Sequence, residues 1–140
     1  KVETILFPFT DQAHARLAKR LLPAYCDYYG ARVKVVQVVS PAISPAARQE
    51  AEANLRNFFQ AEPYPADVEV VRSAETVAGL VRAARGCQLI VMGGDEANML
   101  EQLIAPPIPY QLADQTQKPM IIIRKFQEAE DGGDSSQDVR

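Results

Sequence analysis

Short runs of β-branched and apolar residues alternate along this chain with longer stretches of helical periodicity. The clearest run is Val33 to Val39, which is almost continuously apolar, and Leu89 to Met92 repeats the pattern. A strand that is apolar on both sides must be covered on both faces, which is the rule in parallel sheets. Between these runs, apolar residues recur every three or four positions, as on one face of a helix. The alternation therefore predicts parallel strands covered by helices.

Five strands and four helical stretches are expected in alternating order. The expected strands cover residues 2–9, 33–39, 67–71, 88–92 and 119–124, and the expected helical stretches cover residues 12–29, 46–59, 74–85 and 97–117, the last in two pieces. Pro23 is expected to disturb one turn of the first helix. Strands joined by helices form right-handed crossovers in a parallel sheet. The predicted fold class is α/β, a Rossmann-like five-stranded parallel sheet with helices on both faces.

Length and charge divide the chain into one folded domain and one tail. With 140 residues, of which 47% are hydrophobic, the chain has room for a single packed core. We expect the α/β domain over residues 1–126 and an acidic disordered tail over residues 127–140. The tail contains five acidic residues and one basic residue, with too few apolar side chains to offset the entropy lost on ordering.

The charge balance and the apolar runs exclude several kinds of partner. Without the tail the chain is close to neutral, which leaves no basic surface for nucleic acid or for an anionic membrane. No run approaches the ~18 consecutive apolar residues of a membrane-spanning helix, so direct membrane insertion is not expected. The opening residues, Lys1 to Ile5, form no signal peptide and include no initiator Met, so we expect a fragment of a longer protein.

Few side chains suit catalysis or metal binding. Cys26 and Cys87 are far apart and belong to no metal-binding pattern. We expect them to be buried free thiols in a reducing compartment, which favours a cytoplasmic location. His14, the only histidine, is expected at the surface of the first helix, exposed or half-buried. No metal site and no catalytic residue is predicted.

A candidate ligand crevice lies where the expected strands end. In parallel α/β sheets, ligands bind beyond the carboxyl ends of the strands, at the point where the strand order reverses. The residues expected there are Thr10, Asp11, Val39, Met92, Gly93, Gly94 and Asn98. The Gly93–Gly94 pair could cradle a phosphate, but Gly-Gly pairs more often form a simple turn at the end of a strand, and we expect such a turn here.

Three segments together resemble the universal stress protein family: the opening Ile5 to Phe9, the block Gln88 to Gly94, and the closing Lys118 to Arg124. The resemblance covers about residues 2–125. Family members that bind ATP carry a Gly-x2-Gly-x9-Gly-Ser/Thr loop after the fourth strand, whose backbone donors and hydroxyl cradle the phosphates. The resemblance also implies an acidic residue at the end of the first strand, where this chain has Thr10 followed by Asp11.

This chain departs from that loop at each of its defining positions. Aligned from Met92-Gly93, the first two glycine positions fall on Glu96 and Met99, and the third falls in the proline-rich segment that begins with Pro106 and Pro107. Without glycine at these positions, side chains keep the backbone from approaching a phosphate closely. Proline also has no N–H to donate to it. Asp95 and Glu96 add negative charge where a triphosphate would lie. We therefore expect no cofactor, with ATP or another nucleotide as the alternative.

The last strand is a candidate dimer interface. Its residues are Met120, Ile121, Ile122, Ile123 and Arg124, and an apolar strand at a sheet edge invites pairing. Family members that this chain resembles dimerise by pairing this strand with its two-fold mate. We expect a homodimer of that kind, in which one surface contacts its own copy.

The function expected from these observations is non-catalytic. Universal stress protein-like domains occur as cytosolic C-terminal domains of membrane transporters, including cation/proton antiporters and amino-acid or cation–chloride carriers. The resemblance thus implies a regulatory, ligand-sensing and dimerisation domain, held at the inner face of a membrane as part of such a transporter. The alternative is a free-standing, adenine-nucleotide-binding universal stress protein with weak ATPase activity. A third possibility is a cyclic dinucleotide bound at the dimer interface.

Overall fold

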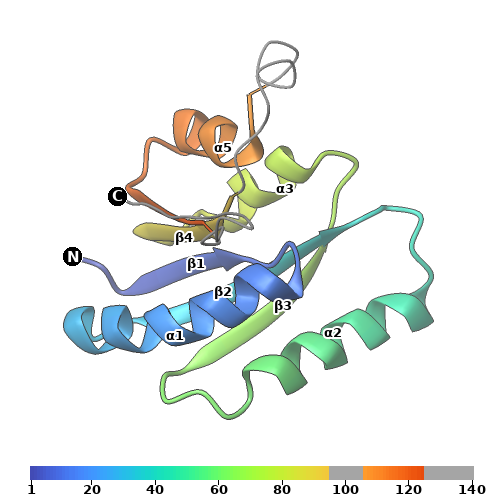
Figure 1. The fold of residues 1–140 in the computed structure, drawn as a ribbon. Coiled ribbons are helices and arrows are strands. Elements are labelled where there is room, and N and C mark those ends of the chain that lie inside the picture. Colours follow the sequence, from blue (N-terminus) through green and yellow to red (C-terminus); the bar gives the residue numbers. More distant parts are fainter. Residues whose placement is uncertain (95–105, 125–140) are drawn as a thin grey trace, which may run out of the picture.

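Five parallel strands form one sheet in the order β3-β2-β1-β4-β5 in the computed structural model, which describes residues 1–94 and 106–124 (Figure 1). The strands are β1 (Thr4–Pro8), β2 (Arg32–Val39), β3 (Ala66–Arg72), β4 (Leu89–Gly93) and β5 (Met120–Ile123). The helices are α1 (Gln12–Tyr29), α2 (Pro45–Phe59), α3 (Thr76–Ala83) and α5 (Ile108–Thr116). The α/β fold class predicted from the sequence is confirmed.

The observed elements lie close to the expected ones. Every strand end agrees with its expected position within two residues, and the second piece of the helical stretch expected over 97–117 is α5. Helix α1 is one helix from Gln12 to Tyr29, as expected, with Pro23 inside it. Three expectations lie outside the described residues: the position of Asn98, the first piece of the helical stretch over 97–117, and the tail over 127–140.

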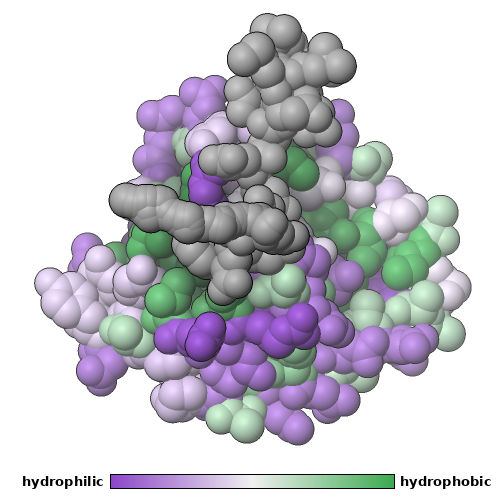
Figure 2. Space-filling model, viewed as in Figure 1, coloured by the Kyte–Doolittle hydropathy of each residue, from purple (hydrophilic) through white to green (hydrophobic). Residues whose placement is uncertain are grey.

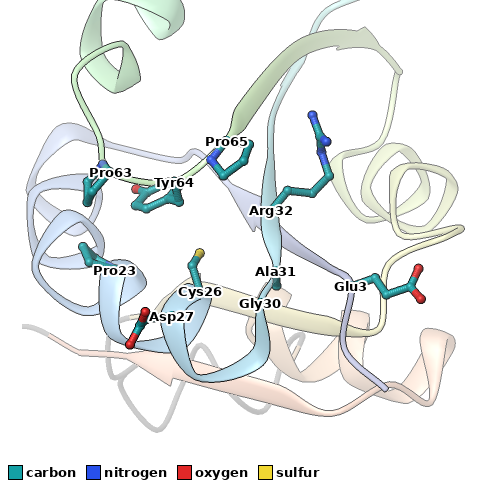
Figure 3. Close-up of a pocket in the computed structure, with 10 residues that line it drawn as sticks. All are labelled: Glu3, Pro23, Cys26, Asp27, Gly30, Ala31, Arg32, Pro63, Tyr64 and Pro65. Atoms are coloured by element: carbon teal, nitrogen blue, oxygen red, sulfur yellow. The ribbon is translucent and has the colours of Figure 1, made fainter.

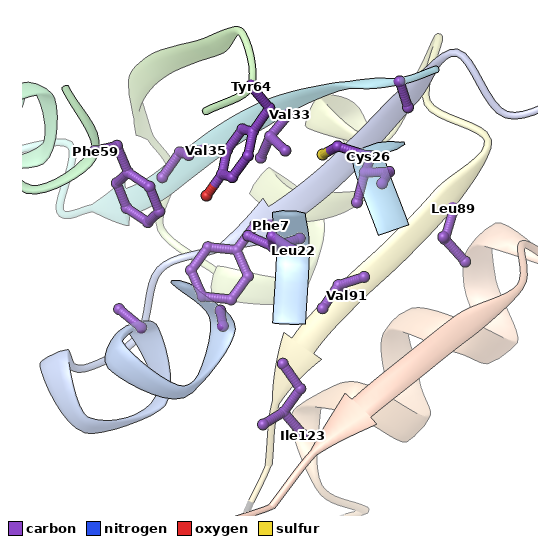
Figure 4. Packing of buried hydrophobic residues seen from close by; sticks show 14 of the residues in the cluster. Phe7, Leu22, Cys26, Val33, Val35, Phe59, Tyr64, Leu89, Val91 and Ile123 are labelled. Atoms are coloured by element: carbon purple, nitrogen blue, oxygen red, sulfur yellow. The ribbon is translucent and has the colours of Figure 1, made fainter. Parts of the chain in front are cut away.

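Helices α1 and α2 cover one face of the sheet and bury the larger core (Figure 4). Phe7 of β1 contacts Phe59 of α2, with ring centroids 6.0 Å apart. Leu22 and Cys26 of α1 pack into the same cluster, together with inward residues of β2 and β4. These helical positions are four residues apart, which is the spacing that places side chains on one helix face.

Helices α3 and α5 cover the opposite face. Their core contains Leu80 of α3 and Leu112 of α5 against Leu6, Ile90 and Met92 of the central strands. All five of these side chains are at most 1% exposed. The two cores explain why β4 reads as a continuous apolar run, since its side chains are buried on both faces.

The surface is mostly hydrophilic where the helices face outward. Hydrophilic side chains dominate the lower part of the view in Figure 2, where α1 and α2 lie. This is the amphipathic pattern of helices that pack one face on a sheet. Within residues 1–94 and 106–124, no helix is both long enough and apolar enough to span a bilayer.

Candidate functional site

The strand order reverses between β1 and β4, which fixes where a ligand crevice would lie. From β1 the chain steps outward to β2 and β3, and β4 and β5 lie on the other side of β1. In such sheets the crevice is beyond the carboxyl ends of the two central strands. The candidate site is therefore built from the residues after Pro8 and around Gly93.

Pro8 ends the pairing of the two central strands. Backbone bonds of Arg32 to Glu3 and of Phe9 to Val36 show that the odd residues of β1 face β2, so Pro8 faces β4. Proline has no N–H to donate to that neighbour. The β1–β4 pairing covers only Ile5–Leu89 and Leu6–Ile90, whereas five residue pairs join β1 to β2. Within residues 1–94, no further ladder pair joins these two strands.

Asp11 starts α1 directly after this point. One carboxylate oxygen, Oδ1, accepts the backbone N–H of His14 at 2.8 Å, the bond of an N-terminal cap. The other oxygen, Oδ2, lies 2.7 Å from Nδ1 of the His14 ring. Asp11 is 48% exposed, whereas His14 is 3% exposed. One side chain therefore both caps the helix and orients the imidazole inward.

The His14 ring occupies the space beside Gly93. A Cβ placed on Gly93 would lie 2.4 Å from Cγ of His14 and 2.5 Å from its Cβ, closer than any real Cβ contact. Gly93 does not have a left-handed backbone. Glycine is therefore required at position 93 by the close approach of His14 and not by its φ angle. The expectation of an exposed or half-buried His14 is wrong, because the reversal of strand order places the ring between α1 and β4.

Gly94 is also engaged with its neighbours. Its N–H donates to the carbonyl of Ile123 at 2.9 Å, which continues the ladder with β5. A Cβ at this position would lie 3.1 Å from Ile122 and 3.2 Å from Pro109. Gly94 thus extends the strand pairing, and its backbone donor is used within the sheet.

The other residues expected at the crevice differ in how far they are exposed to solvent. Thr10 is exposed, and Val39, at the end of β2, is partly buried against the larger core. Met92 is 1% exposed, and its side chain lies in the core beneath α3 and α5. Thr10, Asp11, Val39 and Gly93 follow or end strands at the same edge of the sheet, whereas Asn98 lies outside the described residues.

Sequence reasoning considered His14 but did not foresee its burial. A signal was present, since Asp11-x-x-His14 has the spacing in which a capping carboxylate reaches the third helical residue. The pairing with Gly93 is a contact between residues 79 positions apart in the sequence. No local pattern encodes such a contact.

A separate hollow lies at the amino end of the sheet (Figure 3). Its volume is about 480 Å³, and its lining includes Cys26 and Gly30 of the α1 end and Pro63, Tyr64 and Pro65 before β3. Burial raises the pKa of the Cys26 thiol to about 11. Burial, followed by the nearby Glu62 carboxylate, raises the pKa of Tyr64. Both groups are therefore neutral near pH 7.

Solved structures of known proteins contain the same fold. A universal stress protein in complex with cAMP has a TM-score of 0.69 at 16% identity, over 88% of this chain and 97% of that chain. For the Archaeoglobus fulgidus universal stress protein in complex with dAMP the TM-score is 0.63 at 13% identity, over 87% and 97%. For a Burkholderia pseudomallei protein of that family it is 0.59 at 20% identity, over 87% and 96%.

The chain has the universal stress protein fold. No family model matches the sequence, and no curated protein does. The match to the solved structures therefore rests on the arrangement of the strands and helices, as the low identities indicate.

The universal stress protein fold raises the question of whether a nucleotide phosphate fits at this edge. The His14 ring fills the space at Gly93, and the Gly94 N–H is bonded to Ile123. Pro106, Pro107 and Pro109 around the start of α5 have no N–H to offer. The described residues therefore do not fit a glycine-lined phosphate cradle, which needs free N–H groups and an unobstructed backbone.

Proposed function

We propose that this chain is a non-catalytic regulatory and dimerisation domain built on the universal stress protein fold. The observation that carries the proposal is the His14 ring packed on Gly93 at the reversal of strand order. A nucleotide bound in the manner of a phosphate cradle would need the space that this ring fills. The Asp11 carboxylate beside it adds a negative charge that opposes a phosphate.

The proposed dimer forms through β5, the apolar strand at one edge of the sheet. Met120, Ile121 and Ile122 are partly buried in the single chain, and Ile123 is 5% exposed. A strand of this kind pairs with its own copy about a two-fold axis without requiring a second surface. The relatives' nucleotides, cAMP and dAMP, leave adenine-nucleotide binding as the alternative function.

We also propose that the domain serves as the cytosolic C-terminal part of a membrane transporter. This part of the proposal rests on analogy with transporter domains of the same fold. The coding sequence on both sides of residues 1–140 tests it. A series of long apolar helices before Lys1 would support it, and a start codon at that point would contradict it.

Calorimetric titration with ATP and Mg²⁺ separates the two functions. We expect no binding heat at concentrations up to about 1 mM, the upper end of the usual substrate range. Micromolar binding would favour the nucleotide-binding alternative. A thermal-shift panel with cAMP, dAMP and cyclic dinucleotides extends the test. A raised melting temperature with any of these compounds would contradict a domain that binds no nucleotide.

A further inference from the structure

Strand β3 is an open edge of the sheet, and alternate residues along it face away from β2. Pro65 accepts from Val33, and Ser73 donates to Val39, so the odd residues of this segment face β2. In a parallel ladder the intervening residues face the opposite side. The carbonyls of Ala66, Val68, Val70 and Arg72 therefore point outward, where another strand could bind them.

Two arginines reach this edge from opposite faces of the sheet. Arg48 of α2 donates through Nη2 to the Val70 carbonyl at 3.1 Å. Arg82 of α3 donates through Nη2 to the Arg72 carbonyl at 3.2 Å. Since α2 and α3 cover different faces, the two guanidinium groups lie over and under the edge. A strand that pairs along the full length of β3 would have to displace both bonds. Each bond has a charged donor and is therefore stronger than a hydrogen bond between neutral groups.

Arg48 is held in place by its own helix. Its Nη1 lies 3.9 Å from Oε1 of Glu52, whose other oxygen binds Arg56 at 2.7 Å. Glu52 is 25% exposed, so it is a partly desolvated anchor for the Arg48 guanidinium. The arginine that closes the edge is therefore preorganised, which lowers the entropy that its bond to Val70 would otherwise cost.

Strand β5, the opposite edge, shows no such protection within residues 1–94 and 106–124. Ile90 donates to Pro119 and Gly94 donates to Ile123, so Met120 and Ile122 face outward. Among the described residues we find no side-chain hydrogen bond to the carbonyls of Met120 or Ile122. The two edges of one sheet thus differ: charged side chains cover outward carbonyls on β3, and apolar residues form β5.

We propose that Arg48 and Arg82 close the β3 edge to strand addition and so restrict pairing with a second copy to β5. Only the second half of this statement rests on the proposed β5 dimer. Without the two arginines, each copy would have two usable edges. Two self-pairing edges on one molecule produce an open chain of copies and not a closed dimer.

The test measures molar mass by light scattering in a background that blocks β5. Ile122→Pro removes an outward N–H and spares the ladder with β4, because proline is tolerated where the N–H faces away from the sheet. We expect this variant to be monomeric. Adding Arg48→Met and Arg82→Met, which keep the aliphatic stems, should double the mass by opening β3. Adding Val68→Pro as well should restore the monomer, since the Val68 N–H faces outward.

A matched control separates edge closure from general loss of charge. Arg85→Met removes an exposed arginine near the end of α3 without touching a β3 carbonyl, and it should leave the mass unchanged. A folded Arg48→Met/Arg82→Met/Ile122→Pro variant that stays monomeric would overturn the proposal. If that variant does not fold, Val68→Pro in the otherwise native chain decides: an unchanged mass supports a closed β3 edge, and a lower mass overturns it. A monomeric native chain would contradict the β5 dimer alone.

Discussion

At the scale of single residues, the contact between His14 and Gly93 joins the start of α1 to the end of β4. We predict that Gly93→Ala lowers the free energy of unfolding by about 3 kcal/mol, the upper range for overpacking. The added Cβ would meet the His14 ring at 2.4 Å. His14→Ala should relieve part of this cost, so the double variant should be about 2 kcal/mol more stable than the sum of the two single effects predicts. Urea unfolding of the four proteins measures this coupling.

Gly30→Ala is the control for that cycle. Gly30 has φ +66° and no heavy atom within 4 Å of the added Cβ, so its cost, of about 1 kcal/mol, comes from the backbone alone. This cost should be independent of residue 14. Additive effects of Gly93→Ala and His14→Ala would show that the ring does not constrain Gly93.

The same pair shows how far the sequence predicts the site. Gly93, Thr10 and Asp11 could be placed at the crevice because they follow apolar runs that end at one edge of a parallel sheet. The cap formed by Asp11 was also predictable from its position. The burial of His14 was not, because it depends on how α1 crosses β4, which is a property of the assembled sheet.

At the scale of elements, the carboxyl end of α3 depends on two distant lysines. Lys34 of β2 donates to the Ala83 carbonyl at 3.1 Å, and Lys118, two residues before β5, donates to the carbonyls of Ala84 and Cys87. These bonds satisfy carbonyls at a helix end and place positive charge at the negative end of the helix dipole. A short helix of eight residues needs such support, since packing and not propensity stabilises it.

We predict that Lys118→Met lowers the free energy of unfolding by about 2 kcal/mol, the value of hydrogen bonds to a charged group. The methionine keeps the aliphatic stem but leaves the two carbonyls without this donor. Arg85→Met, at the same helix end but exposed, should change stability by less than about 0.5 kcal/mol. Urea unfolding gives both values. Equal effects of the two substitutions would indicate general charge loss and not the carbonyl bonds.

The elements themselves were largely readable from the sequence, because β-branched runs and helical spacing are local signals. Their ends were less so. The helix expected over 74–85 is shorter, from Thr76 to Ala83, since its start at Glu75 has no side-chain cap and its end is fixed by Lys34 and Lys118. Pro23 does not divide α1, whose apolar face is buried along the sheet at Leu22 and Cys26.

At the scale of the whole molecule, buried thiol and phenol groups make the folded state less stable at alkaline pH. The pKa of Cys26 is raised from 9.0 to about 11, and the pKa values of Cys87 and Tyr64 are raised as well, in each case chiefly by burial. Above pH 9 the unfolded chain loses the Cys26 proton while the folded chain keeps it. The unfolded state then binds fewer protons, so stability falls as pH rises. Below pH 9 this contribution is fully present.

We predict that the free energy of unfolding decreases by on the order of 2 kcal/mol between pH 9 and 11 through Cys26, at 1.36 kcal/mol per pKa unit. Cys26→Ala removes this titrating group, so its stability should fall less steeply over the same range, although packing lost from the core lowers it at pH 7. Tyr28→Phe removes a phenol that is 81% exposed and should leave the slope unchanged. Urea unfolding under reducing conditions at several pH values measures the three slopes. Parallel curves for the native chain and Cys26→Ala would show that this thiol is not desolvated in the folded protein.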